Sequence, residues 1–154
     1  MDKIKIEHIE DFDFELIKTL CELEIESLGD EASINQWVIP VLIRYGMVSI
    51  AKKMPNDEIA GVCQIIRSYR APTEVFIHSF YIRPGFRGKK IGKQLLREVI
   101  DKLRTDDLKK VYLTVDPNKT AALALYGSLG FKCCGTRKDE YGKGIDRNIY
   151  LLAL

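Results

Sequence analysis

The 154-residue chain has no long hydrophobic run, and nothing in it approaches the roughly eighteen apolar residues that a transmembrane helix needs. Its first residues are acidic and amphipathic, whereas a secretory signal has basic residues followed by an apolar segment. Internal repeats, low-complexity tracts and linker-like segments are also lacking. These absences predict a single cytoplasmic domain over residues 1–154, and its 46% hydrophobic content is enough for a sizeable core.

The cysteines lack the spacing of a metal site or of a disulfide framework. Cys21, Cys63, Cys133 and Cys134 are scattered, and they form no C-x-x-C pair. The two adjacent cysteines are poorly placed to bridge each other. We therefore expect reduced and mostly buried thiols, and no metal ion.

The net charge of +2 hides two segments of opposite sign. Residues 1–31 contain eleven acids and three lysines, a balance of −8, whereas residues 83–110 contain ten Lys/Arg and four acids, a balance of +6. This polarity predicts an anionic ligand beside the basic segment and a cationic one near the acidic segment, although solvated helix faces explain the acidic run equally well. Nucleic-acid binding is disfavoured, because the basic segment is short and lacks interleaved aromatic residues that stack on bases.

The periodicity of apolar residues predicts an α/β (α+β) fold with one mixed sheet and helices on its faces. Strands are expected at 3–9, 47–53, 59–69, 75–82, 111–115, 131–137 and 148–152. Helices are expected at 12–29, 33–45, 88–104 and 119–129. Pro40 lies inside the second predicted helix, so we expect a kink or a break there.

The most informative motif is the basic loop Arg83-Pro-Gly-Phe-Arg-Gly-Lys-Lys-Ile-Gly-Lys93, which follows an apolar strand and opens an amphipathic helix. We expect the unpaired N–H groups of the helix start to converge there with the cations of Arg87, Lys89, Lys90 and Lys93. Such a cradle favours a phosphate. The chain lacks G-x-x-x-x-G-K-[ST], and no G-x-G-x-x-G follows its first strand, so a nucleotide triphosphate loop and a dinucleotide fold are both unsupported.

The segment Arg87-Gly-Lys-Lys-Ile-Gly92 resembles the acetyl-CoA loop of the GNAT superfamily of N-acetyltransferases, which reads Q/R-x-x-G-x-G/A. A second stretch, Leu113–Phe131, is similar to the family's other signature, an Asn (here Asn118) followed by small residues and L-Y-x-x-x-G-F. Lys90 departs from the pattern, since it stands where the family's first glycine is usual. The resemblance covers residues 47–131 well. It implies a single mixed, mostly antiparallel sheet of about seven strands, with helices on both faces and a splayed parallel strand pair.

The resemblance also implies that acetyl-CoA is the co-substrate and that its acetyl group passes directly to a primary amine of a small molecule or polypeptide. The implied cofactor-binding residues are Phe80, Tyr81 and Ile82 along the pantetheine arm, Arg87, Gly88, Lys89, Lys90, Ile91, Gly92 and Lys93 at the pyrophosphate, and Asn118 and Tyr126. Tyr126 resembles the general acid that protonates the CoA thiolate; a half-buried helix tyrosine is the alternative. Asn118 contacts the cofactor arm or caps the helix. No cysteine is placed by motif as an acyl carrier, so a ternary complex is expected.

The general base has no obvious candidate. Family members often carry a glutamate on one of the two splayed strands, and Phe76 and Thr114 occupy those positions here. His78 lies two residues beyond Phe76 on the same strand face and suits proton abstraction, unless it is an ordinary strand histidine. Glu74, with a water chain ending on a backbone carbonyl, stays open. We expect His78 to assist catalysis without being indispensable.

Acidic residues of the first two helices lie where the family builds its acceptor pocket, which implies a cationic amine: Glu22, Glu24, Glu26, Asp30 and Glu31. Trp37 and Tyr45 are expected as apolar walls of this pocket or as core residues. The apolar final strand, Ile149–Leu154, is suited to pairing across a homodimer. Because the carboxylate base is missing, a non-catalytic acyl-CoA-binding or regulatory module is the alternative to an enzyme.

Overall fold

The computed structural model describes residues 2–30 and 35–154. In chain order, the described elements are β1 (Ile4–Ile9), α1 (Phe14–Leu28), α2 (Val38–Tyr45), β2 (Met47–Lys53), β3 (Glu58–Arg67), β4 (Glu74–Ile82), a 3-10 turn (Pro84–Phe86), α3 (Ile91–Thr105), β5 (Lys110–Val115), α4 (Thr120–Ser128), β6 (Lys132–Arg137) and β7 (Arg147–Ala153). The order of strands and helices is the one expected from the sequence. Within the described ranges, no helix has the length and apolar character required to cross a membrane.

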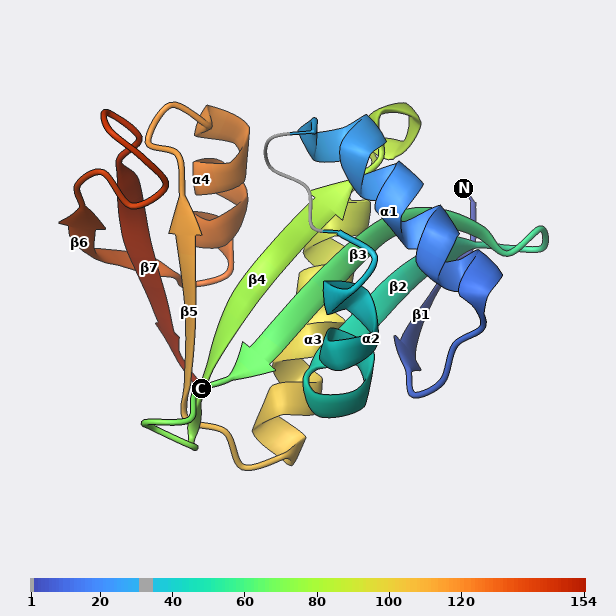
Figure 1. Ribbon diagram of the computed structural model, residues 1–154, viewed down its shortest axis with the longest axis horizontal. Helices are drawn as coiled ribbons and strands as arrows, with labels where there is room; N and C mark the ends of the chain where they lie inside the picture. The colour runs from blue at the N-terminus through green and yellow to red at the C-terminus, as the bar shows by residue number, and fades with distance from the viewer. Residues whose placement is uncertain (1, 31–34) are drawn as a thin grey trace. The chain divides into compact units, whose positions relative to one another are not determined.

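The hydrogen-bonded strand order is β1-β2-β3-β4-β5-β7-β6 (Figure 1). The β4–β5 pair is parallel, whereas β1–β2, β2–β3, β5–β7 and β6–β7 are antiparallel. The mixed, mostly antiparallel sheet of seven strands is therefore confirmed. The chain divides into two compact units, Met1–Ile66 with His78–Val99 and Arg67–Ile77 with Ile100–Leu154. Strand β4 begins in the second unit and ends in the first, whereas α3 begins in the first and ends in the second.

In the first unit, α1 and α2 cover one face of the strands and the start of α3 lies on the opposite face (Figure 1). The core between α1, α2 and the strands consists of buried apolar side chains: Ile17, Leu20, Ile39, Leu42, Ile43, Val48, Ile50, Val62 and Tyr81. Helix α1 begins two residues later than expected and ends before Gly29, as expected. The Asp13 carboxylate accepts a hydrogen bond from the Leu16 N–H (2.8 Å) at its start, and Gly29 ends it with a φ of 86°.

Helix α2 differs from the expectation of a kink at Pro40. The helix begins at Val38, so Pro40 is its third residue and lies in the first turn. The N–H groups of a first turn have no acceptor within the helix, and a proline there removes no hydrogen bond. The stretch 31–34, where the predicted helix was to begin, lies outside the described residues.

In the second unit, the parallel pairing joins Glu74–Phe76 of β4 to Lys110–Tyr112 of β5. Splaying of the two strands beyond these three pairs stays a prediction. Strand β7 pairs antiparallel with β5 on one side and with β6 on the other. The expectation that the final strand pairs across a dimer is therefore wrong, because both of its edges are already occupied; β1 and β6 are the edge strands in this order.

The cysteines differ partly from expectation. Cys63 is buried and Cys21 is partly buried, but Cys133 and Cys134 are exposed. The register of β6 against β7 shifts between Cys133 and Gly135, which makes Cys134 the extra residue of a β-bulge. All four are free thiols.

Candidate functional site

The loop after β4 brings backbone N–H groups to the start of α3. Pro84–Phe86 forms a 3-10 turn in which the Phe86 ring is buried. The first i→i−4 hydrogen bond of α3 runs from the Gln94 N–H to the Lys90 carbonyl (3.1 Å). The N–H groups of residues 91–93 precede this bond, so they point out of the helix end, where they are able to donate to a phosphate.

Two residues of the loop have a left-handed backbone: Gly88 has a φ of 74° and Lys90 a φ of 62°. This conformation costs an L-residue roughly 1–2 kcal/mol, and glycine avoids the cost because it has no Cβ. The backbone shape therefore gives a reason for the glycine that the motif usually has at the Lys90 position. It also explains why α3 begins at Ile91 and not at Gly88, since left-handed residues cannot continue into a right-handed helix.

The two arginines of the loop use their side chains to hold α1. Arg83 Nε donates to Glu26 (2.8 Å), and this hydrogen bond lowers the pKa of the Glu26 carboxyl. Arg87 donates to the Ile82 carbonyl (2.9 Å) and to the Ser27 carbonyl (3.0 Å), which belongs to the last turn of α1. Carbonyls of a last turn lack partners within the helix, so Arg87 caps α1. Two N–H groups of the Arg87 guanidinium are engaged in this way, and contact of its side chain with a bound anion stays a prediction.

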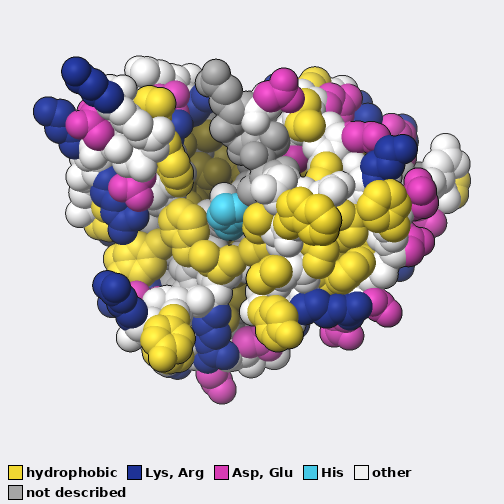
Figure 2. Space-filling view, viewed as in Figure 1, with side chains coloured by type: hydrophobic (Ala, Val, Ile, Leu, Met, Phe, Trp, Pro, Cys, Tyr) yellow, Lys and Arg dark blue, Asp and Glu magenta, His cyan; other side chains and the backbone are white. Residues whose placement is uncertain are grey.

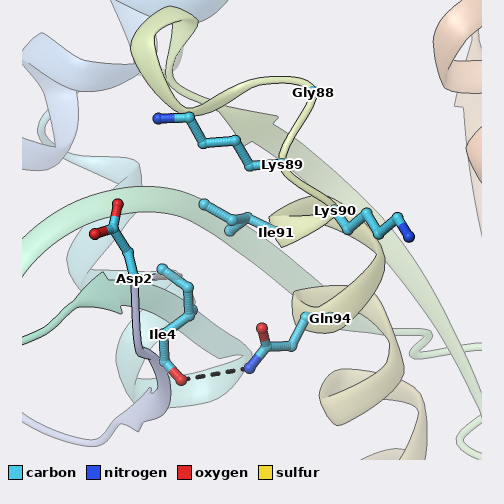
Figure 3. A pocket seen from close by; sticks show the side chains of 7 residues that line it. All are labelled: Asp2, Ile4, Gly88, Lys89, Lys90, Ile91 and Gln94. Carbon is cyan, nitrogen blue, oxygen red and sulfur yellow. Dashed lines mark hydrogen bonds between the residues drawn. The ribbon is translucent and has the colours of Figure 1, made fainter.

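The lysines of the loop do not converge. Lys89 and Lys90 point away from each other, and the Lys89 ammonium lies 5.6 Å from the centroid of the Phe86 ring (Figure 3). They border an open cavity of about 470 Å³ lined by Asp2, Ile4, Gly88, Lys89, Lys90, Ile91 and Gln94 (Figure 3). A hydrogen bond from Lys53, assisted by the charge of Lys89, lowers the pKa of Asp2, so this carboxylate disfavours an anion on its side of the cavity. The backbone amides of the helix start are thus the groups best placed for a phosphate.

The end of β4 provides residues of different exposure. Tyr81 is a core residue, its hydroxyl donates to the Leu20 carbonyl (3.4 Å), and burial raises its pKa far above the ordinary value. Phe80 and Ile82 are half-buried, and the assignment of these three residues to the pantetheine arm stays a prediction. His78 is exposed, and partial desolvation lowers its pKa below the ordinary value, so its ring is mostly neutral near pH 7 and able to accept a proton.

The acidic residues of α1 do not form one surface patch. Glu24 is fully buried, so it is not part of an acidic surface, and its place beside the acceptor stays a prediction. It follows Ile17 and Leu20 at spacings of seven and four residues, on the inner face of the helix. Glu26 pairs with Arg83, Glu22 and Asp30 lie at the surface, and Glu31 lies outside the described residues.

The expected aromatic walls of the acceptor pocket are exposed. Trp37 has 76% and Tyr45 has 84% of its surface accessible. Val41, four residues from each, is exposed as well, so the three side chains form an outer stripe along α2. Figure 2 shows hydrophobic side chains gathered over this part of the first unit. The two aromatic residues therefore belong neither to the core nor to an enclosed pocket.

The second motif lies in the second unit. Tyr126 of α4 is buried, and its ring packs against Phe131 with the centroids 5.8 Å apart. Lys119 occupies the N-cap position of α4 and makes no side-chain cap, while the Asn118 N–H donates to the Asp116 carboxylate (2.9 Å). The interpretation of Asn118 as a helix cap is therefore wrong, and its contact with the cofactor stays a prediction, as does the role of Tyr126.

The structure adds one pair that the sequence reasoning missed. Thr114 Oγ1 of β5 lies 3.2 Å from the Tyr141 hydroxyl, and the Arg147 guanidinium lies 5.3 Å from the centroid of the Tyr141 ring. Thr114 occupies one of the two positions where a glutamate base was expected. Tyr141 lies 27 residues further along the chain, in a glycine-rich loop. No local pattern links residues at such a separation, so only the fold brings them together. No group of three or more metal-ligating side chains occurs within residues 2–30 and 35–154.

Comparisons with known proteins agree with this geometry. The family model described as "Acetyltransferase (GNAT) family" matches residues 9–131. The chain is 39% identical over 82 residues to the N-alpha-acetyltransferase RimI of Mycobacterium tuberculosis, covering 53% of this chain and 49% of that protein. It is 34% identical over 68 residues to the [ribosomal protein bS18]-alanine N-acetyltransferase of Salmonella typhimurium, covering 44% and 46%.

The chain thus spans about half the length of the curated relatives that it matches. Among solved structures, the Bacillus subtilis acetyltransferase in complex with CoA is similar to the whole chain, with a TM-score of 0.76 and 20% identity over 99% of each chain. At that identity the likeness concerns the fold.

Proposed function

Because the chain belongs to the acetyltransferase (GNAT) family, we propose that it transfers the acetyl group of acetyl-CoA to a primary amine. The observation that carries this proposal is the loop before α3, where the left-handed residues Gly88 and Lys90 present the N–H groups of residues 91–93 at the start of a fifteen-residue helix. The names of the relatives and the CoA bound in a neighbour of the same fold support the choice of donor.

In this proposal the donor is held mainly by backbone. The pyrophosphate of acetyl-CoA accepts hydrogen bonds from the N–H groups of Ile91, Gly92 and Lys93, and the flanking lysines add positive charge. The backbone of Phe80–Ile82 runs along the pantetheine arm, and Asn118 contacts the same arm. Arg87 fixes the loop through α1 and contributes its backbone to the site.

The transfer is direct in this proposal. The amine nitrogen attacks the thioester carbon, the new C–N bond forms, the C–S bond breaks, and Tyr126 gives its phenolic proton to the departing CoA sulfur. His78 assists removal of the amine proton. Burial raises the pKa of Cys63 to about 12 and also raises that of Cys21, so these two thiols are poor acyl carriers. Neither motif segment contains a cysteine, which favours a ternary complex.

A coupled assay of CoA-thiol release tests the proposal on peptides with free N-termini, amino acids and polyamines. We expect release with at least one amine, together with an acetylated product of the correct mass. Replacing Tyr126 by Phe is expected to lower kcat by about 10²-fold at saturating acetyl-CoA, because the thiolate then leaves unprotonated. Tyr69→Phe is the matched control, since Tyr69 is 98% exposed, and it is expected to leave kcat unchanged.

A second candidate is a non-catalytic acyl-CoA-binding module, which is favoured by the Phe76 and Thr114 side chains at the positions where a carboxylate base was sought. Calorimetric binding of acetyl-CoA without thiol release over the whole amine panel supports this module. Absence of acetyl-CoA binding contradicts both candidates.

A further inference from the structure

Among the described residues, Glu24 is the one charged side chain that is buried, with no accessible surface. It lies on the inner face of α1, against strands that carry the proposed donor site. Removing a carboxylate from water costs several kcal/mol unless hydrogen bonds compensate for the lost solvation. A buried carboxylate at this position therefore requires partners, and it has them.

Each carboxylate oxygen of Glu24 accepts a hydrogen bond from a different strand. Ser79 Oγ of β4 donates to Oε1 (2.7 Å), and Gln64 Nε2 of β3 donates to Oε2 (3.4 Å). The Ser79 hydroxyl has one proton, which is directed at Glu24, so its lone pairs are able to accept a further donor.

Gln64 adds a second acceptor at the same place. Its Oε1 is buried and has no hydrogen-bond partner. Because Oε1 and Nε2 share one carbon, the unpartnered oxygen lies beside the Glu24 carboxylate. The cluster thus holds three kinds of acceptor: a carboxylate, a hydroxyl oxygen and an unpartnered amide oxygen. Such a cluster favours a ligand that donates several hydrogen bonds, such as an amine or a water molecule.

The position of Ser79 connects this cluster to the proposed chemistry. Ser79 stands between His78 and Phe80, the first residue assigned to the pantetheine arm. The two strand positions where a base was sought, Phe76 and Thr114, hold no carboxylate. The Ser79 hydroxyl connects the Glu24 carboxylate to β4 on the strand face opposite Phe76 and His78, so the cluster offers a proton acceptor from that face.

Building on the proposed function, we propose that Glu24 accepts, through the Ser79 hydroxyl, the proton that the acceptor amine loses. As the C–N bond forms, the amine proton passes to Ser79 Oγ and the Ser79 proton passes to Glu24. The electrons of the breaking C–S bond leave with the sulfur, which takes its proton from Tyr126. When the products leave, Glu24 loses its proton to solvent and Tyr126 regains one, so the net proton moves from amine to thiol.

The other titratable groups near Glu24 do not mimic this step. Burial and the charge of Glu24 raise the pKa of Cys21 on α1 and of Tyr81 on β4. Both stay protonated between about pH 6 and 8. His78 precedes Ser79 in β4, desolvation lowers its pKa, and its own variant separates its contribution.

The test compares Glu24→Gln with Glu15→Gln on an amine that the wild-type protein acetylates. Glutamine keeps the shape of Glu24 and still accepts the Ser79 hydrogen bond, but it cannot take up a proton. We expect kcat to fall by about 10²-fold and the shape of the pH–rate profile to differ from that of the wild-type protein. The affinity for acetyl-CoA and the thermal midpoint should not fall, because removing a buried charge does not destabilise a fold by itself. Glu15 is exposed on the same helix and has no part in the proposed site, so Glu15→Gln should retain wild-type kcat.

Serine variants complete the design. Ser79→Thr keeps the hydroxyl and is expected to retain kcat within about tenfold, whereas Ser79→Ala should lose as much as Glu24→Gln. His78→Ala should lose less than about tenfold. Wild-type kcat in Glu24→Gln or in Ser79→Ala overturns the role of Glu24 and leaves the proposed function standing. Absence of turnover in the wild-type protein with every amine overturns the proposed function, and this inference with it.

Discussion

At the scale of single residues, the backbone conformation of Lys90 matters more than its charge. Its φ of 62° places an L-residue in the left-handed region, and its side chain points away from that of Lys89 (Figure 3). Lys90 therefore adds backbone strain to the loop, and its ammonium group does not converge with that of Lys89 on a single anion. Glycine at the same position removes the strain.

We expect Lys90→Gly to raise the free energy of unfolding by about 0.5–1 kcal/mol. The relief of left-handed strain, roughly 1–2 kcal/mol, exceeds the extra chain entropy that glycine gains in the unfolded state, roughly 0.5–1 kcal/mol. Urea denaturation of both proteins measures the difference. Lys89→Gly removes the same charge from the adjacent position, where φ is not positive, and it should lower stability. Equal effects of the two substitutions would contradict the argument from φ.

At the scale of elements, α1 is connected to β4 and to the loop that follows it by a row of polar contacts. They are the bonds of Leu20 O with Tyr81, Glu24 with Ser79, Glu26 with Arg83, and Ser27 O with Arg87. Leu20 and Glu24 thus connect the carboxyl-terminal half of α1 to β4, and Glu26 and Ser27 connect it to the proposed donor loop. A ligand that orders the loop should also order the end of the helix.

We therefore predict that acetyl-CoA slows amide hydrogen exchange in the last turn of α1 as well as in residues 91–93. The Arg87→Met variant should keep the effect in the loop and lose most of it in α1, because methionine cannot bond to the Ser27 carbonyl. Mass-spectrometric exchange with and without acetyl-CoA measures both segments. Arg97→Met, an exposed arginine of α3, is the control and should behave as wild type. Unchanged protection of α1 in Arg87→Met would show that the guanidinium does not transmit the effect.

At the scale of the whole molecule, a ligand that binds only the folded chain stabilises it by mass action. Acetyl-CoA at about a hundred times its dissociation constant should add about 2.7 kcal/mol, which corresponds to a rise in Tm of about 5–10 °C for a chain of this length. Thermal denaturation over a range of concentrations checks this expectation. NADH at equal concentration should have little effect, since the chain lacks the dinucleotide fingerprint. A similar rise with NADH would indicate general binding of nucleotides.

Much of the fold was predictable because it depends on local patterns. Helix α1 follows from its apolar stripe and Gly29, and the order of the strands and helices follows from period and turn residues. The environments of single side chains on α1 were not predictable in this way, because they depend on which face of the helix packs against the sheet. Glu24 and Glu26 are two residues apart in similar sequence, yet one is buried and the other pairs with Arg83, because helical periodicity turns them to different faces.

The sequence by itself determined the elements, the loop before α3 and the motif that contains Tyr126, since each depends on neighbours within about twenty residues. Only the tertiary structure decided that Arg87 caps α1, that β7 has a strand on each side, and that Glu24 meets Ser79, a residue 55 positions away. These contacts arise from the packing of distant segments, and no local rule of spacing contains them. The basic loop therefore indicates the donor, while the buried carboxylate that we propose as its proton acceptor becomes visible only when the chain is folded.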